Sequence, residues 1–267
     1  MNRLADKVAV VIGAGQSPGE SIGNGRATAL RFLEEGASIL AVDRDIDSAR
    51  ETLRISGQGE GEPFEADVRS VDSLRNAIDF AMSRWGRIDI LHYNVGVSVG
   101  AGDGPLDKIT EESFDRVLAI NLRGAVMAAQ IVEPIMREQR SGVVLNVSSM
   151  SAIETETPNV AYRASKAGLI AFTQQFAMRN AQYGIRANAI LPGRVETAMA
   201  VDTRARLSGT PREEIIAQRR TLIPLQGHVG TGWDIANAAL FLASDEAGFI
   251  TGASLPVDGG ALIKIGF

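Results

Sequence analysis

Residues 8–30 read VAVVIGAGQSPGESIGNGRATAL, and this stretch decides the fold class. The apolar run Val8–Ile12 predicts a buried strand, which glycines follow from Gly13 to Gly25 before an amphipathic helical pattern begins. Glycine permits a tight turn and a close approach of the backbone to a phosphate group, and the positive N-terminal end of a helix attracts that group. The stretch therefore predicts a strand, a phosphate-binding turn and a helix.

Short aliphatic runs and longer amphipathic stretches alternate along the rest of the chain. Further strands are predicted at 38–42, 90–93, 143–147 and 187–191. Helices are predicted approximately over 25–35, 45–54, 71–84, 112–138, 160–183 and 233–243. Apolar strands separated by helices favour a parallel sheet that is covered on both faces. The predicted fold class is a doubly wound α/β fold in a single domain, residues 1–267.

The segment 194–232 differs in character from the rest of the chain. It is more polar, carries Pro211 and Pro224, and has only a short helical pattern near Arg212–Arg220. Because long irregular segments in compact domains are usually functional, we interpret it as a substrate lid. A solvated insertion with no gating role is the alternative.

Composition excludes several classes of protein. The chain has 267 residues, no cysteine and a formal net charge of -5. The absence of cysteine excludes thiol nucleophiles, thiolate zinc sites, iron–sulfur clusters and disulfide scaffolds. The mild acidity argues against binding to nucleic acid, which depends on clustered Lys and Arg. The polar start and the short run Val8–Ile12 predict neither a secretion signal nor a membrane span, so we expect a cytoplasmic protein.

The two histidines do not predict a metal site, because distant His residues without Cys make a poor zinc set. His92 lies within a predicted strand, which favours a packed core residue over an acid–base role. His228 precedes the helical pattern near Trp233 and is expected to be structural or exposed.

Asp43 ends the second predicted strand. A carboxylate at this point accepts hydrogen bonds from the ribose hydroxyls of adenosine and repels a 2′-phosphate, which favours NAD over NADP. Two alternatives stay open: Asp43 could cap the helix near Asp45, and the neighbouring Arg44 could accommodate a phosphate.

Tyr162 and Lys166 stand four positions apart in a helical pattern and therefore project from one face. Ser149 follows the predicted strand 143–147, whose carboxyl end contributes to the ligand crevice of a parallel sheet. The ammonium of Lys166 would lower the pKa of the Tyr162 phenol. Ser149 can stabilise charge on a substrate oxygen. The pattern predicts hydride transfer to or from a nicotinamide, with Tyr162 as general acid/base.

Taken together, these residues resemble the short-chain dehydrogenase/reductase family over essentially the whole chain. The resemblance rests on spaced motifs, namely Gly13, Gly23, Gly25, Asn121, Ser149, Tyr162, Lys166, the run 249–252 (FITG) and the run 257–260 (VDGG). It implies a Rossmann fold, the cofactor NAD, a small-molecule alcohol or ketone as substrate, and a homotetramer. It also implies that Asn121 holds a water for the proton relay and completes a catalytic set with Ser149, Tyr162 and Lys166.

The resemblance further implies a cofactor-binding set. Asp67 resembles the acid that contacts the adenine, 94–96 stands where the family has Asn-Ala-Gly, and the segment from Pro192 to Thr197 resembles the part that holds the nicotinamide carboxamide. The implied residues are Gly13, Gly23, Gly25, Asp43, Asp67, Val68, Asn94, Gly96, Tyr162, Lys166, Pro192, Gly193, Val195 and Thr197.

The chain departs from the family pattern in its glycine-rich turn. The spacing of Gly13 and Gly23 indicates an insertion; the alternative alignment starts at Gly19, well past the strand. Ile12 replaces the usual Thr, and the inserted Ser17, Glu20 or Ser21 could substitute for the loop-ordering hydrogen bond of the lost hydroxyl.

Two further features bear on the reaction. Tyr93 replaces the first Asn of the Asn-Asn-Ala-Gly run, which weakens expectations about that loop's hydrogen bonds. The run 21–25 resembles the phosphate loop of enoyl reductases, but those enzymes place their Tyr and Lys farther apart than Tyr162 and Lys166.

We therefore favour an NAD-dependent oxidoreductase that interconverts a secondary alcohol and a ketone. The alternatives are an NADPH-dependent 3-oxoacyl thioester reductase, which Asp43 disfavours, and a non-catalytic nucleotide-binding protein. The substrate is not assigned. The expected pocket walls are 98–103, 150–157 and the lid, where Arg194, Glu154 and Glu156 either recognise polar groups or form surface salt bridges. Apolar residues on several faces of 112–138 and 160–183 indicate burial against a second subunit or within the core.

Overall fold

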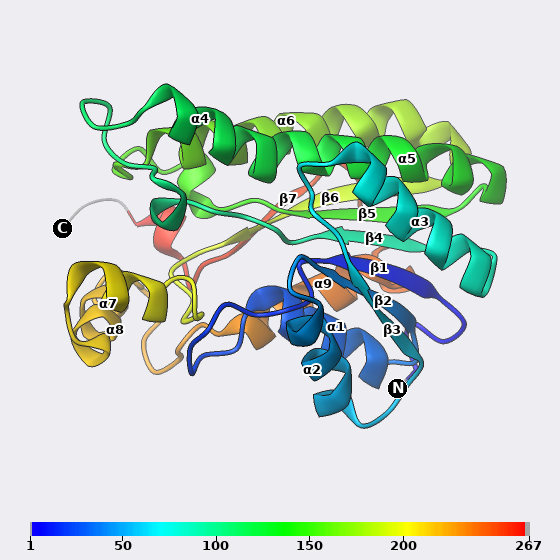
Figure 1. The fold of residues 1–267 in the computed structure, drawn as a ribbon, viewed down its shortest axis with the longest axis horizontal. Coiled ribbons are helices and arrows are strands. Elements are labelled where there is room, and N and C mark those ends of the chain that lie inside the picture. The colour runs from blue at the N-terminus through cyan, green and yellow to red at the C-terminus, as the bar shows by residue number, and fades with distance from the viewer. Residues whose placement is uncertain (1, 265–267) are drawn as a thin grey trace.

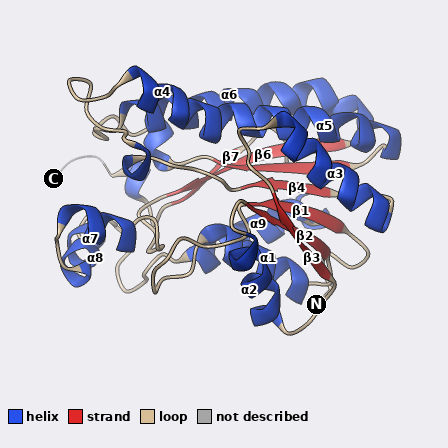
Figure 2. Ribbon diagram, in the orientation of Figure 1, coloured by secondary structure: helices blue, strands red, loops and turns tan. Residues whose placement is uncertain are grey.

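The structure is a computed structural model and describes residues 2–264. Its centre is a seven-stranded sheet, parallel throughout, with helices on both faces (Figures 1 and 2). The strand order is β3-β2-β1-β4-β5-β6-β7. The strands are β1 (Val8–Ile12), β2 (Ser38–Asp43), β3 (Gly61–Glu65), β4 (Ile90–Tyr93), β5 (Gly142–Val147), β6 (Ile185–Pro192) and β7 (Ser254–Val257). The predicted doubly wound α/β fold is confirmed.

The helices agree with the predicted pattern to within a few residues, except in two places. They are α1 (Asn24–Glu34), α2 (Ile46–Ser56), α3 (Val71–Trp85), α4 (Glu111–Leu118), α5 (Gly124–Gln139), α6 (Val160–Asn180), α7 (Asp202–Ser208), α8 (Arg212–Arg220) and α9 (Gly232–Ala243). The predicted helix 112–138 is two helices, and the segment 194–232 holds α7 as well as the expected α8. The segment 194–232 therefore contains more helix than the sequence pattern indicated.

The pattern of aliphatic runs missed both edge strands. β3 carries Pro63 and β7 carries Pro256, and each strand is only partly buried. Proline lacks the backbone N–H that a central strand must donate on both sides, so it is tolerated at the edge of a sheet. Edge position thus explains why these strands lack the apolar pattern of the inner five.

Alternate side chains of the inner strands enter two separate cores. Val10 and Leu91 lie in the core beneath α3, α5 and α6. Ala9 and Ile90 lie in the core on the opposite face, with residues of α1 and α9. Burial on both faces explains why these strands are apolar throughout.

A π-helix at Ala119–Arg123 separates α4 from α5. The hydroxyl of the buried Tyr93 donates to the carbonyl oxygen of Ile120 at 2.5 Å. Single π-turns inside helices often mark functional sites. Tyr93, a departure from the family pattern, thus ties β4 to this irregular turn.

The segment Glu111–Gln139, which spans α4 and α5, is long enough to cross a membrane, and an 18-residue window within it has a mean hydropathy of 1.2. Ala128, Val132 and Met136 of this segment are fully buried in the core between the sheet and α3, α5 and α6. Its apolar composition is that of a core helix.

His92 is fully buried in β4, as predicted for a core residue. Neither Nδ1 nor Nε2 has a hydrogen-bond partner among residues 2–264. The ring of Phe32 meets it edge-on, with centroids 6.1 Å apart. Burial lowers the pKa of His92 from 6.5 to about 4, so the imidazole is neutral in the folded chain.

Replacing His92 with leucine should stabilise the protein by about 1–3 kcal/mol at neutral pH, because the ring leaves two buried polar atoms unpaired. It should also reduce the loss of stability between pH 6.5 and about pH 4, where the unfolded chain binds a proton at this residue and the folded chain does not. Denaturant unfolding at several pH values measures both effects, with the exposed His228→Gln as control. An acid sensitivity equal to that of the wild type would contradict this assignment.

Candidate functional site

The loops that follow β1, β4, β5 and β6 meet at the carboxyl edge of the sheet, on the left in Figure 1. The strand order reverses between β1 and β4, and in open α/β sheets such a point opens a crevice for ligands. α7 and α8 lie beyond the same edge (Figure 1). The structure therefore brings the candidate loops and the expected lid to one side of the molecule.

Two glycines in contact build the turn after β1. Gly13 has a φ of +87°, which residues with side chains rarely adopt, and its N–H donates to the carbonyl of Val42 at 2.8 Å. A Cβ on Gly25 would overlap the carbonyl oxygen of Gly13, so only glycine lets α1 begin this close to the turn. The Nδ2 of Asn94 donates to the same carbonyl at 3.2 Å.

The N-terminus of α1 is suited to an anion. α1 has no side-chain N-cap, whereas α2, α3, α4 and α9 each have one. The Gly23 N–H donates to Oε1 of Gln16 at 2.9 Å, and the buried Oδ1 of Asn24 has no hydrogen-bond partner within residues 2–264. Uncapped backbone N–H groups and the helix dipole favour a phosphate here. These residues fit the pyrophosphate of a dinucleotide.

The structure separates the two roles that the sequence left open for Asp43. The helix cap of α2 is Asp45, whose Oδ1 accepts from the Ser48 N–H at 3.1 Å. Asp43 instead lies at the end of β2, where its Oδ2 accepts from the Gly15 N–H at 2.9 Å. Its Oδ1 accepts from the Asp45 N–H at 3.1 Å. A carboxylate has about four acceptor positions, so Asp43 retains capacity for ribose hydroxyls.

The inserted part of the turn is held by a residue that sequence reasoning passed over. Gln16 donates its N–H to Oγ of Ser48 at 2.8 Å while its Oε1 accepts from Gly23. Of the three residues considered for the lost loop hydrogen bond, Glu20 and Ser21 contact Arg212 of α8.

The other implied cofactor residues lie on neighbouring loops. Asp67 follows β3 and pairs with Nη2 of Arg69 at 2.6 Å, and hydrogen bonds from Arg69 lower the pKa of that carboxyl. Val68 is partly buried against the core beside it.

After β6, which ends at Pro192, Gly193 lies where a Cβ would be 2.5 Å from Cα of Asp258. The Oγ1 of the buried Thr197 accepts from the Ala200 N–H at 3.2 Å. The structure thus orders this loop by backbone contacts.

Ser149, Tyr162 and Lys166 come together at the carboxyl edge of the sheet. Ser149 is near enough to Tyr162 to lower the pKa of its phenol. Nζ of Lys166 lies 5.7 Å from the centroid of the Tyr162 ring and donates to the carbonyl of Val147 at 2.7 Å. A Cβ on Gly96 would be 3.1 Å from that Nζ, so the small residue leaves room for the lysine.

The charges that act on Tyr162 differ from those expected. Burial raises the pKa of the Tyr162 phenol, while the hydrogen bond with Ser149 and the charges of Arg204 and Arg219 lower it. Burial also lowers the pKa of Lys166 to about 7, so this residue is only partly charged near neutral pH. Arg204 and Arg219 thus add a cationic influence on Tyr162 that sequence analysis did not anticipate, while Nζ of Lys166 lies over the ring.

Asn121 lies in the π-helix and is fully buried. Its Oδ1 accepts from the Val97 N–H at 2.8 Å, and its Nδ2 donates to the Val97 carbonyl at 2.9 Å and to Oγ of Ser165 at 3.0 Å. Asn121 thus fixes the loop after β4 against α6, the helix that carries Tyr162 and Lys166.

Asp103, which sequence analysis placed only in a pocket wall, positions the start of α6. Its two carboxylate oxygens accept the N–H groups of Ala161 at 3.1 Å and Tyr162 at 2.9 Å. It also accepts from Oγ of Ser98 at 3.3 Å. An acidic residue is stabilising at a helix N-terminus. Asp103 is far from α6 in the sequence, so no local sequence pattern indicated this contact.

The inserted turn contacts the lid helices directly. Arg212 of α8 donates through Nη2 to Oγ of Ser21 at 2.7 Å and pairs through Nε with Asp202 at 3.2 Å. Arg206 of α7 donates to the carbonyl of Pro18 at 2.9 Å. A Cβ on Gly19 would lie 2.6 Å from the carboxylate of Asp202. The insertion and the lid therefore form one contact surface.

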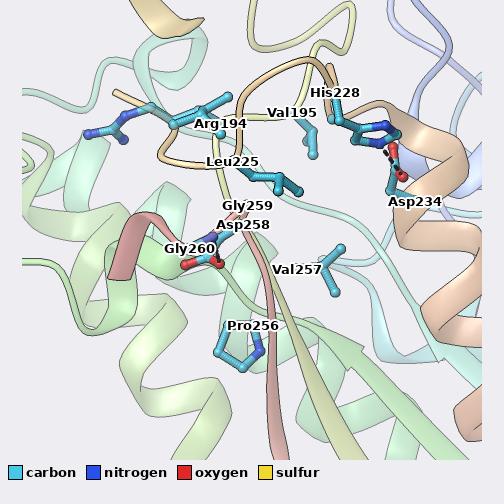
Figure 3. A pocket seen from close by; sticks show the side chains of 12 residues that line it. Arg194, Val195, Leu225, His228, Asp234, Pro256, Val257, Asp258, Gly259 and Gly260 are labelled. Carbon is cyan, nitrogen blue, oxygen red and sulfur yellow. Dashed lines mark hydrogen bonds and ion pairs between the residues drawn. The ribbon is translucent and has the colours of Figure 1, made fainter. Parts of the chain in front are cut away.

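Arg194, at the start of the lid, forms an ion pair with Glu154 at 2.7 Å, with side chains 21% and 15% exposed. Salt-bridge formation was one of the two readings that the sequence left open for this pair. A cavity of about 520 Å³ lies between the loops after β6 and β7 and the start of α9 (Figure 3). His228 on its rim contacts Asp234 at 2.9 Å, in keeping with its predicted structural role.

The fold and this site define a class, the nicotinamide-dependent oxidoreductases built on a doubly wound sheet. A family model described as enoyl-(acyl carrier protein) reductase matches residues 19–261. The chain is 35% identical to the 3-oxoacyl-[acyl-carrier-protein] reductase FabG of Thermotoga maritima, over 98% of this chain and 100% of that relative. It is 31% identical to the 7alpha-hydroxysteroid dehydrogenase of Bacteroides fragilis, over 98% and 97%.

Solved structures agree with these relatives. A crystal structure from Burkholderia xenovorans, described as of the short-chain dehydrogenase/reductase type, superposes with a TM-score of 0.91 at 39% identity and covers 99% of both chains. Levodione reductase superposes with a TM-score of 0.88 at 30% identity, over 98% of this chain and 99% of that one. The chain belongs to the short-chain dehydrogenase/reductase family, whose members are oxidoreductases with nicotinamide cofactors.

Replacing Arg212 with methionine should loosen the inserted turn, because it removes the contacts to Ser21 and Asp202. We expect amide hydrogen exchange in residues 17–22 to become about two- to tenfold faster, the range that one lost hydrogen bond produces. Mass-resolved hydrogen exchange measures this rate, with Arg220→Met on the same helix as control. Unchanged exchange in the turn would show that the contact does not hold it.

Proposed function

We propose that the chain is an NAD-preferring oxidoreductase that interconverts a secondary alcohol and a ketone, with Tyr162 as general acid/base. The observation that carries this proposal is the grouping of Tyr162, Ser149 and Lys166, with Nζ of Lys166 5.7 Å from the centroid of the Tyr162 ring and one helical turn away. Names of relatives add support, since they include a hydroxysteroid dehydrogenase and a (3R)-3-hydroxyacyl-CoA dehydrogenase.

Tyr162 moves the proton at its phenolic oxygen. In the oxidative direction it accepts the hydroxyl proton of the alcohol, and in the reductive direction it donates that proton to the ketone oxygen. Ser149 donates a hydrogen bond to the same substrate oxygen and stabilises its developing negative charge. A bound NAD supplies the acceptor for the hydride that leaves the substrate carbon.

The remaining candidates would hold the cofactor. Gly13, Gly23 and Gly25 line the pyrophosphate position at the start of α1. Lys166 has three donor positions, of which Val147 uses one, and we assign the others to the nicotinamide ribose. Among the other assigned residues, Asp67 and Val68 serve the adenine, and Asn94, Gly96, Pro192, Gly193, Val195 and Thr197 serve the nicotinamide side.

Changing Tyr162 to phenylalanine should lower kcat by about 10²–10⁴-fold, the usual contribution of a general acid/base, and leave NADH binding intact. Steady-state kinetics and NADH fluorescence titration measure the two properties. Tyr183→Phe is the matched control, because Tyr183 packs against Arg137 away from the site. Wild-type turnover by the Tyr162 variant would refute the assignment.

The preference for NAD depends on Asp43, whose carboxylate would repel a 2′-phosphate. The separate helix cap at Asp45 leaves that carboxylate available for the cofactor.

Asp43→Asn retains an acceptor for the Gly15 N–H and removes the charge. We expect the ratio of kcat/KM with NAD to kcat/KM with NADP to fall by about ten- to a hundredfold, as a lost charge contact does. Asp45→Ala serves as control: it should lower stability by about 1 kcal/mol and leave the ratio unchanged. If the Asp43 variant keeps the wild-type ratio, the ribose assignment fails.

The name of the FabG relative favours one alternative, an NADPH-dependent 3-oxoacyl thioester reductase. Efficient reduction of an acetoacetyl thioester with NADPH would favour this alternative over the first proposal.

We also propose that the protein acts in the cytoplasm as a homotetramer. The family resemblance supports this assembly, and so do large apolar side chains exposed on the single chain, such as Met178 on α6 and Phe249 before β7.

A further inference from the structure

Three arginines of the segment 194–232 interact through their charges with one another or with Tyr162. They are Arg194 after β6, Arg204 on α7 and Arg219 on α8. Arg204 and Arg219 act electrostatically on the Tyr162 phenol, and Arg194 and Arg204 act on Arg219. We call Arg194, Arg204 and Arg219 the arginine cluster.

Contacts with the loops around the site fix two members of the cluster. Nη2 of Arg219 donates to the carbonyl of Val195 at 3.2 Å. Nη1 of Arg194 lies 3.7 Å from Sδ of Met150, the residue that follows Ser149. Arg194 lines the cavity between the loops after β6 and β7, and in Figure 3 its guanidinium points away from the other lining side chains. The cluster therefore belongs to the Ser149 and Tyr162 side of the lid.

The positive charge of the cluster is only partly balanced. Glu154 pairs with Arg194, while Glu196 forms its ion pair with Arg220 at 3.1 Å and acts on Arg219 only through its charge. Within residues 2–264, neither Arg204 nor Arg219 forms an ion pair, and the buried Nε of Arg219 has no hydrogen-bond partner. Burial, followed by the charges of Arg204 and Arg194, lowers the pKa of Arg219 to about 10. Enclosing an unpaired guanidinium beside like charges is unfavourable unless an anion joins it.

We propose that the arginine cluster binds an oxyanion group of the substrate, so that the reacting alcohol or ketone is a hydroxy acid or oxo acid. This inference rests on the proposed function. The planar guanidinium of Arg219 suits bidentate contact with a carboxylate, sulfonate or phosphate. Arg219 contacts Val195 and interacts through its charge with Tyr162. The acidic group of the substrate would therefore lie on the side of the reacting carbon that faces α7 and α8.

The cofactor's own phosphates have a separate position. They fit the N-terminus of α1, where Arg206 and Arg212 contact the inserted turn. Arg219 contacts the loop after β6 instead. A role for Arg219 in pyrophosphate binding would therefore appear as a raised KM for NAD, which the experiment below measures.

The test compares matched substrates and neighbouring arginines. The substrates are 3-hydroxybutyrate and its methyl ester, lactate and its methyl ester, 2-hydroxypropanesulfonate, and glycerol 3-phosphate with glycerol as its neutral partner. The proteins are the wild type, Arg219→Met, Arg219→Lys and Arg220→Met, the last being the control on the same helix. Steady-state kinetics give kcat/KM for each substrate and KM for NAD. Thermal stability of the NADH complex with each anion gives a readout that needs no turnover.

We expect the wild type to prefer acids over their neutral partners by about 10²-fold, and Arg219→Met to lose most of that preference while Arg220→Met keeps it. Arg219→Lys should retain part of it. The carboxylate, sulfonate and phosphate arms identify which oxyanion fits. Equal use of acids and neutral partners by the wild type, or a raised KM for NAD in Arg219→Met, would overturn the inference while the proposed function stands. If no substrate is turned over, the inference is overturned when the anions raise the thermal stability of the NADH complex equally in the wild type and in Arg219→Met. Failure of NADH to bind would instead refute the proposed function.

Discussion

The contact between Gly13 and Gly25 is the constraint on which the site depends. The carbonyl of Gly13 occupies the space that any Cβ on Gly25 would need, so α1 begins directly against the turn after β1. Its first N–H groups thereby face the carboxyl edge of the sheet without a side-chain cap. A phosphate suits such a helix end, and the position that we propose for the dinucleotide rests on this fit.

The rest of the site is assembled by contacts between distant segments. Asp103 accepts the N–H of Tyr162 at the N-terminus of α6 and so helps to fix the position of Tyr162. Asn121 fixes the loop after β4 against the same helix. Arg212 joins the inserted turn to the lid. The inserted turn and the segment 194–232, which we propose lie at the phosphate and substrate ends of the site, are therefore joined by direct contacts.

The inner strands and most helices could be predicted from the sequence because burial on both faces leaves long apolar runs. The edge strands could not, since Pro63 and Pro256 and partial exposure hide their pattern. Tyr162 and Lys166 were recognisable from their spacing in one helix. The contacts of Asp103 and Arg219 were not, because their partners come from remote segments and only the folded chain brings them together.

The measurement that tests this account most directly is oxidation of secondary alcohols with NAD and NADP in parallel, together with titration of NADH and NADPH into the protein. The account predicts tight NADH binding, weaker NADPH binding and reduction of NAD by one class of alcohol. Failure of both reduced cofactors to bind would contradict it, because the uncapped start of α1 and the free capacity of Asp43 would then have no ligand.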